Sequence, residues 1–219
     1  MKLIFIASHG FALRMLTQTG ILDRLQANGL RVALVLQNSQ DEAINNIGLS
    51  NEIEINDYDF KLSQLKSEVM ILKRYCTEKV LINPALREKH YKNIRSKSPR
   101  RRLKYQLYLI VHRSLILSKI SMKLIEFLEK NWRNKIIDKY SNLFTNSTVI
   151  TTYPANYSEF LLVNAAKSLG NPVILNLLSW DNLTTKGKIN VEPDTFLSWG
   201  PIMSLEFRKL KNSFELNNG

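Results

Sequence analysis

Two short segments hold the side chains best suited to chemistry, and the first of them, residues 8–10, follows an apolar run at the start of the chain. The imidazole of His9 titrates near neutral pH, so it can accept a proton from a hydroxyl group. Arg14 follows about one helical turn later and suits a phosphate or carboxylate group. The alternative is that His9 is a polar turn residue and Arg14 an exposed helix residue.

The second segment, residues 179–200, concentrates a Trp, an Asp–Asn pair, a Lys–Gly turn and a Trp–Gly pair between two apolar runs. The indole of Trp180 can stack on a ring, and Asp181 and Asn182 can hydrogen-bond hydroxyl groups. Lys186 can contact an anion. Each has a structural alternative, because a Trp is often a core residue and Asn and Lys are common in turns and caps.

Parallel strands are the elements that would position both segments. Residues 2–7 predict a buried strand, residues 11–27 an amphipathic helix and residues 31–36 a second strand, which together make a βαβ unit. The apolar run before the second segment lacks period-two alternation, as is typical of a strand buried in a parallel sheet. Because the carboxyl ends of such strands open onto the ligand crevice, we expect His9 and Asp181 to line one mouth.

The rest of the chain keeps this rhythm of strands and helices. We expect a short helix at 41–46, an edge strand at 52–55, a helix at 62–82, strands at 148–152, 172–178 and 195–199, a loop at 153–157, and helices at 158–169 and 201–211. The sequence therefore predicts an α/β fold, a Rossmann-like open parallel sheet flanked by helices. Residues 1–211 would form a single domain, and residues 212–219 a loose polar tail or the start of a linker.

A basic segment interrupts this rhythm. Residues 87–139 hold 16 Lys and Arg against four acidic residues, whereas the remainder of the chain carries 15 basic and 15 acidic residues. The net charge of +12 therefore belongs to one segment. We expect a helical insertion at about 87–140, with a break at 96–99 before Pro99 and a long helix or helical hairpin from 101 to 140.

The cations of this insertion form a candidate anion-binding stripe. They are Arg100, Arg101, Arg102, Lys104, Arg113, Lys119 and Lys123. Such a stripe is commonly a solvated face, but a basic amphipathic helix also lies well on an anionic membrane or a lipid-linked phosphate. Nucleic acid is disfavoured, because no recognisable module accompanies the charge and Tyr105 and Tyr108 fall within an apolar helix.

The composition argues against several other kinds of site. Cys76 is the single thiol, which excludes an intrachain disulfide and fits a reducing compartment. His9, His90 and His112 do not have a metal-ligand spacing, so we expect no metal, and we expect no cofactor. No window approaches 18 uncharged apolar residues. We expect a cytoplasmic protein that is peripheral, at most, to the inner face of the cytoplasmic membrane.

Several of these residues carry a resemblance to a known family. The run SWDNLTTKG at 179–187, then PDTFLSWG at 193–200 and a helix with Glu206, resembles the end of the N-terminal domain in bacterial glycosyltransferases of the two-Rossmann-domain (GT-B) type. The opening strand, turn and helix resemble that domain's start, and residues 160–172 fit its penultimate helix and the turn after it. The resemblance spans nearly the whole chain, although the middle third matches in basic, helical character rather than in motif.

The resemblance implies the acceptor-binding half of a glycosyltransferase. Such enzymes transfer a sugar from a nucleotide-sugar donor to a glycan or lipid-linked acceptor, here for a cell-surface polysaccharide. Their C-terminal domain makes most donor contacts, and we expect it to be missing from this chain or separate, so that the chain alone turns over little. His9 would be the catalytic base. The acceptor-binding residues would be Gly10, Arg14, Trp180, Asp181, Asn182 and Lys186.

Two other functions remain open at this stage. The chain could be a non-catalytic basic module that docks on an anionic membrane or a partner, in which case only the Lys and Arg positions would matter. It could also be half of a sugar-nucleotide epimerase, because these enzymes share the two-domain plan.

Overall fold

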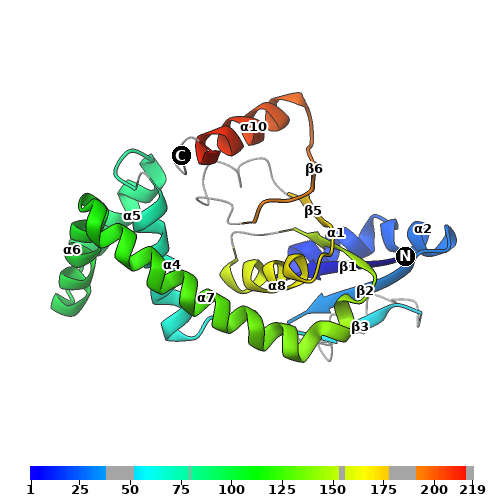
Figure 1. The fold of residues 1–219 in the computed structure, drawn as a ribbon. Coiled ribbons are helices and arrows are strands. Elements are labelled where there is room, and N and C mark those ends of the chain that lie inside the picture. Colours follow the sequence, from blue (N-terminus) through cyan, green and yellow to red (C-terminus); the bar gives the residue numbers. More distant parts are fainter. Residues whose placement is uncertain (38–51, 79, 153–155, 178–190, 216–219) are drawn as a thin grey trace.

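The computed structural model describes residues 1–37, 52–78, 80–152, 156–177 and 191–215 (Figure 1). Within them, six strands form one all-parallel sheet in the order β3-β2-β1-β4-β5-β6. They are β1 (Lys2–Ala7), β2 (Arg31–Leu36), β3 (Glu54–Asp57), β4 (Ser147–Thr151), β5 (Val173–Asn176) and β6 (Thr195–Leu197). The expected α/β, Rossmann-like open sheet is confirmed, because this strand order is typical of that fold.

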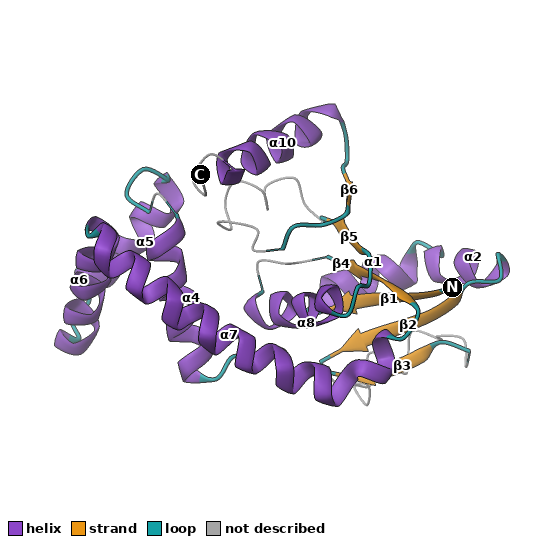
Figure 2. Cartoon of the chain, viewed as in Figure 1, coloured by secondary structure: helices purple, strands orange, loops and turns teal. Residues whose placement is uncertain are grey.

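Helices cover both faces of the sheet (Figure 2). On one face, α1 (Gly10–Gln18) and α2 (Ile21–Ala27) pack on a core that includes Phe5 and Leu34. The other face holds a larger core, built from Ile4 and Val149 together with α8 (Tyr157–Ser168) and α7 (Leu115–Phe144). Alternate side chains of β1 enter opposite cores, which explains why this strand is apolar without interruption.

A helical arm, defined as α4 (Gln64–Thr77), α5 (Pro84–Ile94), α6 (Pro99–Arg113) and α7, connects β3 to β4. Figure 1 shows α5 and α6 projecting away from the sheet, whereas α7 runs back to it. The projecting part has a small core of its own, Tyr75, Val80, Leu86 and Tyr105. The helical insertion expected from the basic segment is therefore present, and α4 belongs to it.

Two of the expected long helices are broken. The helix predicted over 11–27 is interrupted at Gly20, whose φ of 65° lies in the left-handed region that glycine adopts at low cost. The helix or hairpin predicted over 101–140 is two helices, because Ser114 ends α6 in an extended conformation and its hydroxyl then accepts a hydrogen bond from Leu117 N at the start of α7.

Most other elements lie close to their expected bounds. The break predicted at 96–99 is confirmed, because α5 ends at Ile94 and α6 begins at Pro99. The predicted edge strand is confirmed at the edge of the sheet, two residues later than expected. The last helix, α10 (Pro201–Glu215), extends into the segment predicted to be a loose tail. The predicted helix at 41–46 and most of the loop at 153–157 lie outside the described residues.

Candidate functional site

The parallel sheet has its switch point between β1 and β4. The chain builds β2 and β3 on one side of β1, and then returns to build β4, β5 and β6 on the other side. The loops after β1 and β4 therefore diverge at the carboxyl edge, which is where ligands bind in open α/β sheets. Ser8 and His9 follow β1 at this edge, and Thr152 follows β4.

A buried carboxylate ties these two strand ends together. Glu159 lies in the first turn of α8, is fully buried, and accepts hydrogen bonds from the hydroxyls of Ser8 and Thr151, the latter at 2.5 Å. The backbone N–H of Thr152 donates to the same carboxylate at 3.0 Å, and the Thr152 hydroxyl donates to Ile6 O at 3.1 Å. Because buried charge is costly unless it is well hydrogen-bonded, this network fixes the backbone on both sides of the switch point.

His9 caps α1 at this edge. Its backbone is extended, and its Nδ1 accepts a hydrogen bond from the backbone N–H of Ala12 at 3.2 Å. An amide N–H can only donate, so while this contact holds a neutral ring carries its proton on Nε2. Burial lowers the pKa of His9 below its ordinary value, so the ring is neutral at neutral pH. His9 becomes a proton acceptor at Nδ1 only when the contact with Ala12 opens.

The neighbours of His9 leave the first loop accessible. Phe11 is 47% exposed and its ring stacks beside the imidazole, with the two ring centroids 6.5 Å apart. Among the described residues, nothing lies within 4 Å of a Cβ at Gly10, and the side chain of Arg14 is exposed. The loop therefore offers an imidazole, an aromatic face and a guanidinium from one helix end.

The remaining predicted acceptor contacts are not tested. Trp180, Asp181, Asn182 and Lys186 lie outside the described residues, and so does their predicted meeting with His9. The strand before them, β5, does run parallel to β4, so its carboxyl end is at the same edge of the sheet as that of β1.

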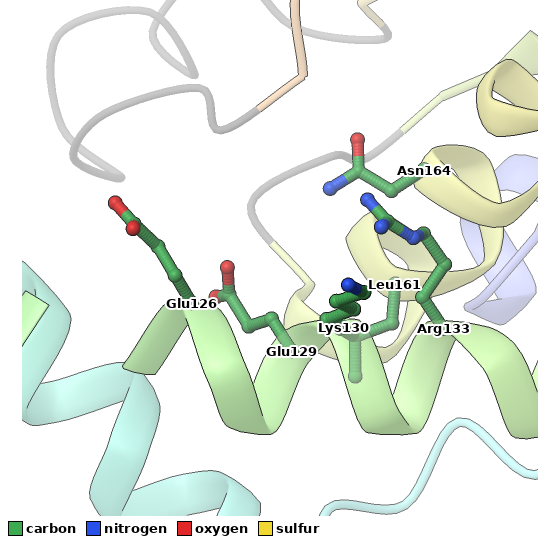
Figure 3. A pocket seen from close by; sticks show the side chains of 6 residues that line it. All are labelled: Glu126, Glu129, Lys130, Arg133, Leu161 and Asn164. Carbon is green, nitrogen blue, oxygen red and sulfur yellow. The ribbon is translucent and has the colours of Figure 1, made fainter. Parts of the chain in front are cut away.

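A pocket of about 270 Å³ lies between α7 and α8 (Figure 3). It is lined by Glu126, Glu129, Lys130, Arg133, Leu161 and Asn164. Figure 3 shows Arg133 and Asn164 reaching one end of the pocket, whereas Glu126 projects from α7 at the other end. The Nε atom of Arg133 is buried and has no hydrogen-bond partner among the described residues.

The carboxylate of Glu129 is already engaged at the wall of this pocket. Lys73 Nζ lies 2.8 and 3.0 Å from its two oxygens, and the Tyr157 hydroxyl donates to it at 2.6 Å. Burial raises the pKa of Tyr157 above its ordinary value, and the negative charge of Glu129 raises it further. The phenol therefore stays protonated. Among the described residues, no side-chain hydrogen bond or ion pair engages Arg133, Asn164 or the exposed Glu126, so these side chains can offer donors and an acceptor to a ligand.

The cations of the predicted anion-binding stripe all lie on α6 and α7. Lys104 is bound to Glu68 of α4 at 2.6 Å, so it stabilises the arm from within. Among the described residues, the other six cations make no ion pair within 4 Å, and each is exposed.

Two further predictions concern metal ions and membrane spans. In the described part of the chain, no group of three or more His, Cys, Asp and Glu side chains could hold a metal ion. His90 is buried and bonded to the Tyr75 hydroxyl, with 2.6 Å between His90 Nδ1 and Tyr75 Oη, so it is part of the arm's core. No described helix is both long and apolar enough to cross a bilayer.

Comparison with known proteins assigns no family. No family model, no curated protein and no solved structure matches this chain.

Sequence reasoning missed several residues of the candidate site, among them Glu159, Arg133 and Asn164. Glu159 has a detectable signal, because an acidic residue directly before the apolar run 160–163 can indicate a buried carboxylate with partners. Arg133 and Asn164 have no comparable signal, since they come from helices that meet only in three dimensions.

Proposed function

We propose that this chain is the acceptor-binding domain of a glycosyltransferase that uses a nucleotide-sugar donor. The observation that carries the proposal is the position of His9, at the carboxyl edge of the sheet and beside the switch point, directly after Ser8, whose hydroxyl is bound to Glu159. The resemblance in residues 179–200 supports the same reading. The donor would bind to a second domain, on the same polypeptide or on a partner.

The acceptor would be a glycan or a lipid-linked glycan. Phe11 offers an exposed aromatic face of the kind on which sugar rings stack. The pocket between α7 and α8 combines guanidinium, amide and carboxylate groups around the apolar Leu161, and such planar polar groups pair well with adjacent hydroxyls. The anionic phosphate of a lipid-linked acceptor would suit Arg14.

The chemical role proposed for His9 is to accept the proton of the attacking acceptor hydroxyl. The lowered pKa favours the neutral ring that this role needs. Because Ala12 occupies the lone pair of Nδ1, acceptor binding would have to open the cap before transfer. The proton would pass from the hydroxyl oxygen to the ring as the oxygen attacks the sugar carbon and the nucleoside diphosphate leaves.

A glycan array probed with the chain tests the binding step without a donor domain. We expect selective binding to a group of related glycans. His9→Ala should weaken it at least about tenfold, which corresponds to the loss of roughly one good polar contact. His9→Asn can still cap α1, so it controls for a purely structural effect. Arg133→Ala tests the pocket, with Lys97→Ala on the exposed loop before α6 as the matched control. Absence of any glycan binding would contradict the proposal.

A further inference from the structure

The helical arm exposes large apolar side chains on both α6 and α7, together called the apolar ridge. Two stripes contribute to it, one on α6 at positions i, i+4 and i+7, and one on α7 with similar helical spacing. The residues of the apolar ridge are Leu103, Leu107, Ile110, Ile116, Ile120, Leu124 and Phe127, each at least 53% exposed. Leu115, at the junction of the two helices, is 80% exposed. Such a concentration of exposed large apolar side chains marks an interaction surface.

Basic residues accompany the ridge along its whole length. Residues 99–125 contain seven Lys and Arg and no acidic residue. Apart from Lys104, which pairs with Glu68, these cations are exposed and make no ion pair among the described residues. The surface therefore offers apolar side chains and free positive charge together.

We propose that the apolar ridge and its flanking cations dock the arm on an anionic lipid surface, with α6 and α7 lying in the interface. Burying the ridge among acyl chains removes apolar area from water, and the cations meet lipid phosphates at the headgroup level. The described helices cannot span a bilayer, so the contact is interfacial. This inference does not depend on the proposed function.

Charge distinguishes this occupant from a second copy of the chain. Two arms packed ridge to ridge would bring the exposed arginines of two copies together, and no acidic residue in 99–125 would neutralise them. A lipid surface of negative charge supplies both the apolar medium and the counter-charge. An acidic protein surface would supply the charge but needs a matching apolar groove.

Vesicle co-sedimentation of the chain tests the proposal. We expect binding to phosphatidylcholine vesicles with about 30% phosphatidylglycerol, and little binding to phosphatidylcholine alone. Ile120→Asn with Phe127→Asn should reduce the partition coefficient at least about tenfold, because both side chains leave the acyl region. Replacing Arg100, Arg101 and Arg102 with Gln should reduce it by roughly 100-fold. These positions are exposed, so the variants should fold as the parent does.

A matched control keeps the test specific. Ile21→Asn with Lys61→Gln changes exposed residues outside the arm and should leave vesicle binding unchanged. Raising the salt from about 0.1 M to about 0.5 M should weaken binding without abolishing it, because the apolar contact persists. Equal binding to neutral and anionic vesicles, or unchanged binding of the ridge variant, would overturn the proposal. So would a parent dimer that the ridge variant converts to a monomer with no change in vesicle binding.

Discussion

The carboxyl edge of the sheet and the helical arm arrange the same kinds of residue in opposite ways. At the edge, the half-buried His9 and the exposed Phe11 lie beside a well-packed apolar core. In the arm, Tyr75 and His90 lie in the interior beside Leu86, whereas other apolar side chains such as Leu107 and Ile120 are exposed. The first arrangement suits a polar small ligand, and the second suits an apolar, charged surface. In this chain the burial of a residue therefore indicates its role better than its type does.

The largest expected effect is on the free energy of unfolding, and a Leu→Ala substitution in each region should show it. Leu162 of α8 is completely buried, whereas Leu107 of α6 is 53% exposed. Leu162→Ala should lower the free energy of unfolding by about 3 kcal/mol through lost burial and a new cavity. Leu107→Ala should change it by less than about 0.5 kcal/mol. Urea denaturation measures both, and a large loss from Leu107→Ala would show that the ridge is covered in the folded chain.

The next effect concerns the polar network at the switch point. Glu159→Ala removes the acceptor for the Ser8 and Thr151 hydroxyls and for the Thr152 amide, so we expect a loss of about 2 kcal/mol in urea denaturation. Glu88→Ala changes an exposed carboxylate of the arm and serves as the control, with an effect within about 0.5 kcal/mol. Equal effects of the two variants would mean that the network does not hold the edge together.

Acidification should weaken the arm through His90. Burial lowers the pKa of His90 below its ordinary value, and the positive charges of His112 and Arg113 lower it further. The folded arm therefore binds fewer protons than the unfolded chain. Its stability is fully present above about pH 6.5, the unfolded value, and falls as the pH drops below it. The slope is at most about 1.4 kcal/mol per pH unit for one proton.

Hydrogen exchange of peptides from α5 and α6 as a function of pH measures this loss. The double variant His90→Phe with Tyr75→Phe keeps an aromatic ring at each position. It lacks both the titrating imidazole and the hydroxyl group that is bonded to it. We expect its exchange in the arm to show a weaker dependence on pH. A dependence as steep as that of the parent would assign the effect to another group.

The smallest expected effect is at the first loop. Gly10 is the first residue of α1 and has space around it for a Cβ, so Gly10→Ala should raise the free energy of unfolding slightly, by less than about 1 kcal/mol. If the loop binds an acceptor closely, the added methyl group should nevertheless weaken glycan binding. A loss of stability in thermal denaturation would instead show that Gly10 is needed for the fold.

The sheet was largely predictable from sequence, because buried parallel strands are uninterrupted apolar runs and both β1 and β2 have the expected bounds. The breaks within helices were harder to predict, because a single residue decides each of them. Gly20 and Ser114 both interrupt an apolar pattern that otherwise continues through them. The position of His9 at the carboxyl edge was predictable, because it follows directly from the local prediction of a strand before it and a helix after it. The pocket at Arg133 was not predictable, because its lining comes from two helices, α7 and α8, whose contact is not a local feature of the sequence.

Hydrogen exchange of one protein sample in two bound states tests the separation of the two regions most directly. With a glycan selected on the array, we predict protection of peptides covering residues 8–16 and 156–164. With anionic vesicles, we predict protection of residues 103–127 and none at residues 8–16. Protection of the same peptides by both ligands, or no protection of residues 8–16 by the glycan, would contradict the account.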